Sequence, residues 1–398
     1  MLRLTTAAAL LAATSSLAHA VEPDEFAAAM KAASARAQVD WSVTDARAEG
    51  DAILLEDITV SKNGQPLINL GTMRFEGVAE SPEGIRFATA TGETIERSYP
   101  APRPSEPEMK LTVARYGAEN GLIPGEGAPD FLQNVAAYGA IVERVFAEDL
   151  RFDRPATVAL ELGALDIQYG YESEPFTFSA KAAEGVLDIT AALAQDAPPD
   201  AQAWFAETGY DVMRFGVEMD GSYDTASGTF DVPTYRFAFE DMGTLEFELA
   251  ASGMTPELMQ GFGDAMTGAQ ASQDDKAALG MGLMGMMIQK GTIRFTDDGL
   301  TDNIFALAEK QTGQNRQGLK GVVLGSAPIG LGMIGASDLV GPAFNALNAY
   351  FDAPGSLEIS IANNGPVPVG AIATTAQTNP KAIAPMLGLG IAANGTKY

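Results

Sequence analysis

The strongest constraint on the fold is a period-two alternation of apolar and polar residues. It runs through three stretches, "MRFGVEM" (213–219), "TYRFAFE" (234–240) and "TLEFELA" (244–250). Successive side chains of a strand point to opposite faces of a sheet, so this period predicts strands with one dry face and one wet face. The links between the stretches are short and turn-like, which predicts an antiparallel meander over residues 212–251.

Earlier segments show a similar alternation, and two helices are expected among them. The predicted strands are 51–60, 66–78, 158–171 and 176–189. One predicted helix lies near residues 23–38. The other lies near 129–150, where five residues follow helical spacing: Phe131, Val135, Tyr138, Val142 and Val145.

The character of the chain changes after residue 252, where glycine, alanine and methionine become frequent. Helices are expected at 255–266, 274–290, 297–313 and 337–351, and strands at 291–295 and 355–362. Asp298 or Thr301 is expected to cap the third of these helices.

These patterns predict an α+β fold, in which twisted antiparallel sheet(s) with one wet face are packed by Gly/Ala/Met-rich helices. The predicted division has three parts: a signal peptide (1–20), an acidic β-rich region (21–251) and a helix-rich α/β region (252–398).

Residues 1–20 are typical of a secretory signal peptide. Arg3 precedes a small and apolar stretch, and Ala18-His19-Ala20 matches the small-x-small pattern of a cleavage site. His19 is the single histidine of the chain, which also has no cysteine. We therefore expect an exported, periplasmic protein whose mature form has no Ser-His-Asp triad, no thiolate chemistry and no standard zinc site.

The net charge of −27 argues against some partners. A surface this acidic repels phosphate backbones, so nucleic-acid binding is not expected. The charge is uneven, because residues 299–398 hold five acidic and five basic residues and all of the excess lies before them.

The stretch "GMGLMGMMIQKGTIRF" (280–295) contains a candidate ligand-binding cluster, Met281, Met284 and Met287. Thioethers suit Cu(I), but such sites usually recruit His or Cys as well. Methionine between glycines more often fills irregular gaps in a core, and an adaptable surface for a lipid or a partner is the third possibility. We expect buried packing here, no metal and no cofactor.

The run "GVVLGSAPIGLGMIGAS" (321–337) is uncharged and supplies the other candidate residues, Val323, Leu324, Ile329 and Leu331. Pro328 and the glycines argue against a membrane span. Two interpretations stay open: a buried pair of helices or loops, and an apolar lip that dips into a bilayer or guides an acyl chain.

Catalysis receives little support. Adjacent acidic pairs occur at Glu240-Asp241, Asp274-Asp275 and Asp297-Asp298, but acidic residues are so numerous that such pairs arise by chance. A Ser-Lys pair is not excluded. No catalytic residue is predicted, and a hydrolase that uses carboxylates or a Ser-Lys pair is kept as an alternative.

Three stretches resemble a group of uncharacterised secreted proteins of Gram-negative, alphaproteobacterial bacteria. They are "GSYDTASGTFDV" (221–232), "IRFTDDGLTDNIFALAEKQTG" (293–313) and "FDAPGSLEISIANNGPVPV" (351–369). The front half, with "LEDITV" and "MRFEGV", is loosely similar to the one-sided sheets of AsmA-type envelope proteins, which implies a lipid-holding trough. The resemblance transfers no functional residue.

The function expected from these observations is that of a non-enzymatic periplasmic envelope protein. It would hold a lipid-like ligand or a membrane-protein partner in an apolar trough. A structural or assembly factor without a small ligand remains a further alternative. The sequence gives no prediction of the oligomeric state.

Overall fold

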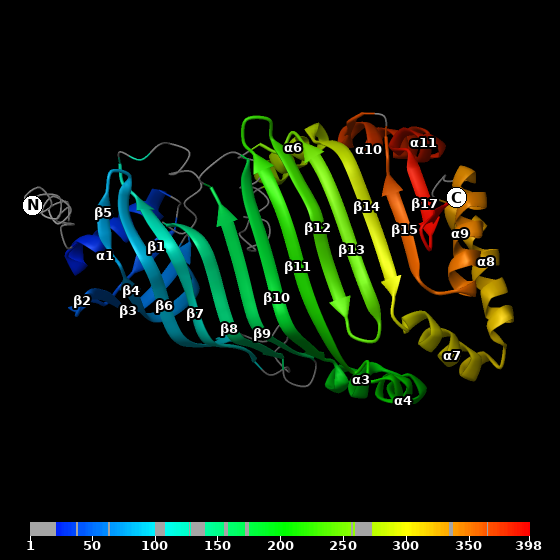
Figure 1. Cartoon of the computed structure of the whole chain (residues 1–398), viewed down its shortest axis with the longest axis horizontal. Coiled ribbons are helices and arrows are strands. Elements are labelled where there is room, and N and C mark those ends of the chain that lie inside the picture. The colour runs from blue at the N-terminus through cyan, green and yellow to red at the C-terminus, as the bar shows by residue number, and fades with distance from the viewer. Residues whose placement is uncertain are drawn as a thin grey trace, which may run out of the picture. The chain divides into compact units, whose positions relative to one another are not determined.

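The chain forms two compact units, and antiparallel strands predominate in both. The computed structural model describes residues 21–36, 39–62, 64–99, 108–126, 128, 140–154, 158–171, 175–255, 258, 273–333, 337–363 and 365–398. Unit 1 comprises Met1–Pro100 and Glu108–Arg151, and unit 2 comprises Ala101–Pro107 and Phe152–Tyr398. The fold is α+β, as the alternation predicts. The elements are labelled in Figure 1.

Unit 1 is an antiparallel sheet with one long helix. The helix is α1 (Pro23–Arg36), and the strands are β1 (Asp40–Ser42), β2 (Asp45–Glu49), β3 (Ala52–Lys62), β4 (Gln65–Glu76), β5 (Ala79–Ser81), β6 (Gly84–Tyr99), β7 (Met109–Pro124) and β8 (Ile141–Arg154). The pairing runs β3–β4–β6–β7, with β1 and β2 on β3 and β5 on β6. Helix α1 confirms the helix predicted near 23–38.

The core of unit 1 lies between α1 and its sheet. Phe26 of α1 packs edge-on against Phe75, with ring centroids 4.8 Å apart, and Phe75 packs edge-on against Phe87 at 5.4 Å. All three rings are buried. The helix thus removes one apolar face of the sheet from water, which is the main source of stability in a sheet of this kind.

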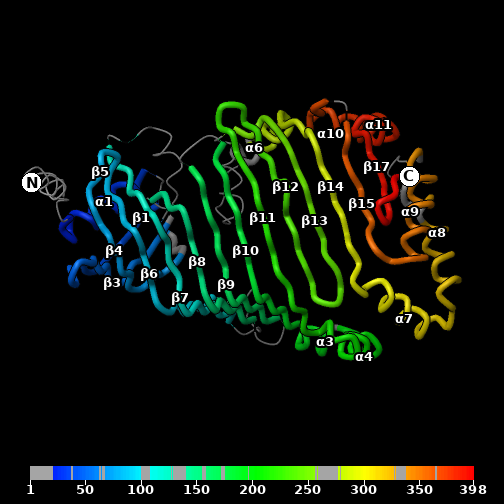
Figure 2. The backbone as a smooth tube through the Cα atoms, viewed as in Figure 1, coloured from blue at the N-terminus to red at the C-terminus, as the bar shows by residue number. Residues whose placement is uncertain are grey.

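Unit 2 contains a broader sheet of sequential antiparallel strands. They are β9 (Val158–Gly170), β10 (Phe176–Asp188), β11 (Val212–Asp224), β12 (Thr229–Phe239), β13 (Gly243–Ser252), β14 (Met287–Asp297), β15 (Ser356–Ile361), β16 (Val367–Pro368), β17 (Leu389–Ala393) and β18 (Thr396–Lys397). The order is β9–β10–β11–β12–β13–β14–β15–β17, with β16 on β14 and β18 on β17. Figure 2 traces β10 to β15 as neighbouring curved strands. Strands β11 to β13 confirm the predicted meander.

The helices of unit 2 lie mostly at the ends and one side of this sheet (Figure 1). They are α3 (Thr190–Asp196), α4 (Pro199–Thr208), α6 (Gln273–Gly285), α7 (Leu300–Thr312), α8 (Arg316–Met333), α9 (Val340–Asp352), α10 (Val369–Thr378) and α11 (Ile383–Leu387), with 3-10 turns at Ser337–Leu339 and Pro380–Ala382. Helix α9 packs on β15 and β17, and α8 packs on α7 and α9. None of the described helices combines the length and the apolar character needed to cross a membrane.

The helix predicted at 129–150 is wrong over its second half, where residues 141–150 belong to strand β8. The helical spacing of apolar residues takes no account of strand partners that are distant in the sequence. Arg144 of β8 forms a 2.7 Å ion pair with Glu119 of β7, and Asn120 donates to Glu143 at 2.6 Å. Residues 129–139 lie outside the described part of the chain, as does most of the helix expected at 255–266.

Three boundaries also differ from the sequence prediction. The break expected at 251/252 is not a unit boundary, because β13 and β14 on either side of it pair along their whole length. The helix expected at 274–290 ends at Gly285, and its last four residues begin β14. The N-cap residue of α7 is Gly299 rather than Asp298 or Thr301. The side chain that binds the first turn is that of Asp297, whose Oδ1 accepts from the Thr301 amide at 2.9 Å.

Candidate functional site

Two apolar rows cross the sheet of unit 2. Residues paired across antiparallel strands share a face, so the register defines these rows directly. One row is Leu165, Ala182, Val217, Phe237, Leu245, Phe295, Leu357 and Ala393. The other is Ile167, Ala180, Met219, Tyr235, Phe247, Ile293, Ile359 and Ile391. We call the surface formed by both rows the apolar face of unit 2.

A row of alternating charges lies on the opposite face, one residue out of step with the apolar rows. In strand order this charge row is Asp166, Lys181, Glu218, Arg236, Glu246, Arg294 and Glu358. The ion pairs along it measure 3.3 Å for Lys181–Glu218, 3.5 Å for Glu218–Arg236, 2.8 Å for Arg236–Glu246, 3.4 Å for Glu246–Arg294 and 2.7 Å for Arg294–Glu358. The pKa of Arg294 is raised, and the largest cause is its hydrogen bond to Glu358. This face is therefore a water-facing surface.

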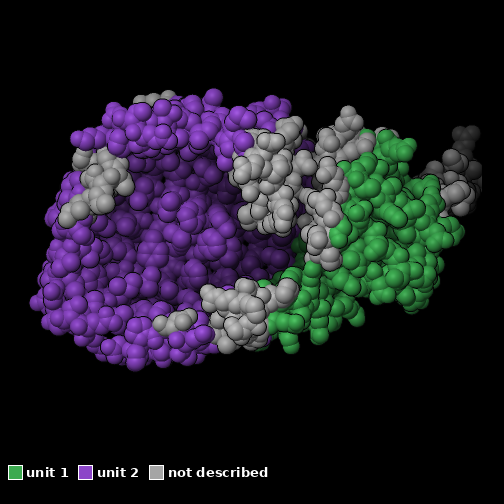
Figure 3. Space-filling model, turned by 180° about the vertical axis from the view of Figure 1, so that it is seen from behind, with its two compact units in different colours: residues 1–100, 108–151 green, residues 101–107, 152–398 purple. Residues whose placement is uncertain are grey.

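The backbone geometry shows which face is hollowed. Strand β11 runs upward in Figure 1 with β12 on its right, and the Arg214 carbonyl accepts at 3.0 Å from the amide of Glu240, the residue that follows β12. For an L-residue in an upward strand, a carbonyl pointing right places the side chain toward the viewer. The face of the charge row therefore points toward the viewer of Figure 1, and the apolar face points the other way. In Figure 3, which is seen from that other side, unit 2 is hollowed between raised rims.

Helix α9 covers one margin of the apolar face. There Ile391 and Ala393 are buried against Ala343, Ala346 and Tyr350 of the helix. The cover is incomplete on the next two strands, because Ile359 of β15 and Ile293 of β14 are 47% and 48% exposed. The row from Met219 of β11 to Ile359 of β15 is thus partly open to solvent rather than a sealed core.

Aromatic rings form the middle of this open surface. Tyr235 lies 4.7 Å from Phe237 and 6.0 Å from Phe247 between ring centroids, and Phe237 meets Phe247 edge-on at 6.3 Å. All three are half-buried. Rings that pack on each other form a firm floor, and their outer surfaces remain available for an apolar contact.

The two ends of the strands are tied down by hydrogen bonds. At one end, Tyr210 donates to the Asp241 carbonyl at 2.8 Å and accepts from Asn303 of α7 at 2.7 Å. At the other end, Tyr223 donates to the Met254 carbonyl at 2.8 Å. Helix α7 is therefore tied to one end of the strands, and the segment that follows β13 is tied to the other end.

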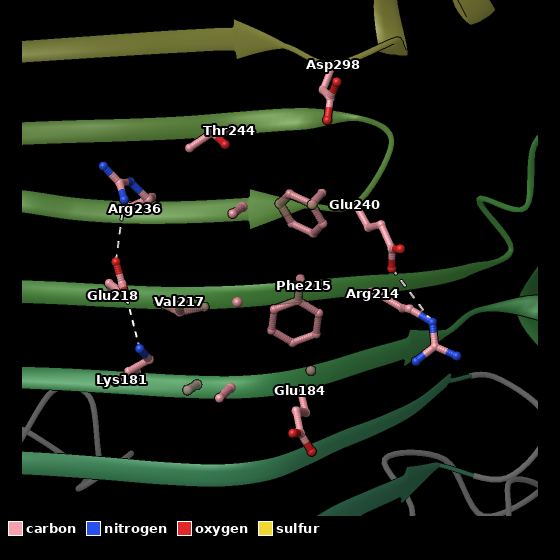
Figure 4. Close-up of a pocket in the computed structure, with 16 residues that line it drawn as sticks. Lys181, Glu184, Arg214, Phe215, Val217, Glu218, Arg236, Glu240, Thr244 and Asp298 are labelled. Atoms are coloured by element: carbon pink, nitrogen blue, oxygen red, sulfur yellow. Dashed lines mark ion pairs between the residues drawn. The ribbon is translucent and has the colours of Figure 1, made fainter.

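A second hollow, of about 820 Å³, lies on the face of the charge row (Figure 4). Its floor carries the small residues Ala183, Gly216 and Ala238. The lining cations already have carboxylate partners, as in the Arg214–Glu240 pair at 3.8 Å. The hollow therefore results from short side chains between two groups of internal ion pairs.

The predicted methionine cluster lies on the surface and not in the core. Met281, Met284 and Met287 are 72%, 50% and 41% exposed, whereas Met286 is buried. Helix α6 carries the first two, and the register pairs Met287 with Ser252, on the face of the charge row. The expectation of buried packing is wrong for these three residues, because α6 packs against α10 at the end of the strands.

The candidates from the run 321–337 lie on another element. Helix α8 contains them, with Val323 40% exposed and Leu324 buried. Ile329 and Leu331 fall within α8, and their side chains lie outside the described part of the chain. Since α8 packs on α7 and α9 whereas α6 packs on α10, the structure does not bring the two sets of candidates into one site.

The apolar face itself was not among the predicted ligand-binding residues, although its signal was present in the sequence. The alternation in 213–219, 234–240 and 244–250 predicts a dry face, and a dry face is ordinarily covered. The missing information was that the helices lie at the ends and one margin of the sheet, which depends on tertiary structure.

The ion pairs of the described residues give no support to the catalytic alternatives. Four lysines pair with carboxylates rather than serines, as Lys320 does with Asp352 and Lys290 with Glu248. The other two pairs are Lys181–Glu218 and Lys310–Glu207. Within the same described residues, no group of three or more His, Cys, Asp or Glu side chains is placed to hold a metal ion.

Part of unit 2 is similar to a protein family. A family model described as "Uncharacterized protein" matches residues 236–394, which lie within unit 2 and span β12 to β17. No curated protein is significantly similar to the chain. The match covers less than half of the chain and carries no activity.

Proposed function

We propose that the chain is a non-enzymatic envelope protein that holds one lipid-like amphiphile on the apolar face of unit 2. The observation that carries the proposal is the contrast between the two faces of one sheet. One face has a row of seven charged residues, and the other has two apolar rows that are half exposed at Ile293 and Ile359. Exposed apolar surfaces of this extent mark binding sites in soluble proteins.

The dimensions of the open surface support a lipid-like ligand. Neighbouring strands lie about 4.8 Å apart, so β11 to β15 span about 19 Å. Along β13, Leu245 to Leu249 extend over about 14 Å. One leaflet of a bilayer holds its acyl chains in a layer about 15 Å thick, which is half of the hydrocarbon core. The uncovered area therefore matches the acyl part of one lipid.

Two finer points belong to the same proposal. The wet face is the one with the charge row, and among the described helices α9 covers the dry face along one margin. The location in the envelope rests on the predicted signal peptide at residues 1–20. The alternative roles, an assembly factor without a ligand and a hydrolase, predict no stoichiometric amphiphile.

Native mass spectrometry of protein purified from its own host tests the proposal. We expect an added mass of one amphiphile per chain, and its release should free the site for a fluorescent fatty-acid probe. A bare polypeptide mass under gentle conditions, together with no probe binding, would overturn it.

A pair of substitutions locates the site. Ile293→Asn with Ile359→Asn removes two neighbouring exposed apolar side chains, and we expect probe affinity to fall at least about tenfold. The matched control is Val212→Asn, because Val212 is 41% exposed and lies six residues before Glu218 on β11, so it shares the face of the charge row. Equal affinity losses in the control and the double variant would place binding elsewhere.

A further inference from the structure

We propose that helix α8 docks the protein on a bilayer surface. This goes beyond ligand holding and does not depend on it. Val322 and Val323 of α8 are 61% and 40% exposed, and the neighbouring residues Gly321, Gly325 and Ser326 are also exposed. Val322 and Val323 therefore form a small exposed apolar surface on the helix, whereas Leu324 between them and Gly325 is buried.

Ion pairs hold α8 firmly on the neighbouring helices. Arg316 binds Asp302 of α7 at 2.7 Å, and its guanidinium lies 4.8 Å from the ring centroid of Phe305. The buried Lys320 pairs with Asp352 of α9. The first turns of α8 are thus anchored, so the exposed residues that follow are presented on a rigid support.

The charge distribution selects a bilayer as the partner. The chain has a net charge of −27, but residues 299–398 hold equal numbers of acidic and basic residues. No charged residue occurs from Gly321 to Ser337. An anionic membrane surface repels an acidic protein, so the neutral region around α8 can approach lipid head groups at the least electrostatic cost.

The helix can also enter the interface without breaking its own hydrogen bonds. A helix satisfies its backbone groups internally, as an apolar environment requires. Since α8 is not long and apolar enough to cross, it would lie in the head-group region with Val322 and Val323 toward the acyl chains.

Flotation of the purified full chain with vesicles tests this inference. The wild type should float with vesicles of phosphatidylethanolamine and phosphatidylcholine. Added phosphatidylglycerol should weaken binding, and 0.5 M salt (on the order of a 4 Å screening length) should restore it. Val322→Asn with Val323→Asn should lower partitioning at least about tenfold, whereas Val212→Asn should leave it unchanged. No flotation with any composition, or undiminished flotation of the double variant, would overturn the inference.

A second variant gives a signal that does not depend on losing function. Tryptophan emission of Val322→Trp should shift to shorter wavelength when vesicles are added, and that of Val212→Trp should not. An unshifted emission of Val322→Trp would count against docking.

Light scattering tests whether α8 binds a second copy of the chain instead of a bilayer. A dimer that Val322→Asn dissociates would show that it does. Loss of docking with intact probe binding separates this inference from the proposed function.

Discussion

The two units use the same kind of sheet in opposite ways. In unit 1, α1 covers the apolar face, and Phe26, Phe75 and Phe87 are removed from water. In unit 2, Tyr235, Phe237 and Phe247 also pack together, but they remain half-buried, and among the described helices α9 packs at the margin on β15 and β17. The difference shows that an alternating pattern defines a dry face, whereas the placement of helices decides whether that face becomes a core or a binding surface.

The largest effect should come from truncating the core of unit 1. Phe75→Ala removes a buried ring, and we expect the free energy of unfolding of unit 1 to fall by about 3–5 kcal/mol. Phe247→Ala removes a half-buried ring of unit 2 and should cost about 1–2 kcal/mol. Denaturant unfolding of each variant, followed for two transitions, measures both values. Equal losses would mean that the apolar face of unit 2 is a core after all.

The stability of each unit should depend on alkaline pH through one buried tyrosine. Burial raises the pKa of Tyr116 in unit 1 and of Tyr350 in α9 to about 12, while an unfolded tyrosine titrates near 10. The stabilisation is therefore fully present below pH 10 and is lost as the pH rises toward 12, by roughly 1–2 kcal/mol for each tyrosine. Thermal melts of Tyr116→Phe and Tyr350→Phe between pH 9 and 12 should lose this dependence in their own unit. A dependence that survives both substitutions would assign it to other groups.

The smallest effect should come from the charge row. Arg294→Met removes a partner of both Glu246 and Glu358, and we expect a loss of about 1 kcal/mol in unit 2, since the pair is partly exposed. Added salt should lower the stability of wild-type unit 2 and have less effect on the variant. A variant as salt-sensitive as the wild type would show that the row contributes little. Arg74→Met, which removes the exposed pairs with Glu49 and Glu76, is the matched control in unit 1.

Local patterns predicted the elements better than they predicted the site. The meander at 212–251 and the helix near 23–38 were confirmed, because the spacing of apolar residues is a property of neighbouring residues. The helix at 141–150 was wrong because the pairing of Arg144 with Glu119 of another strand overrides a helical stripe. Met281, Met284 and Val323 were chosen for their composition, but their exposure depends on which helix packs on which neighbour.

The open apolar face also has a colloidal consequence. Two copies that met through Ile293 and Ile359 would cover each other's apolar rows, so the exposed face favours self-association. A net charge of −27 opposes such encounters through long-range repulsion, and this protection vanishes near the sequence pI of about 4.3. The negative charge of the chain can thus keep the molecules apart in water while an apolar surface remains uncovered.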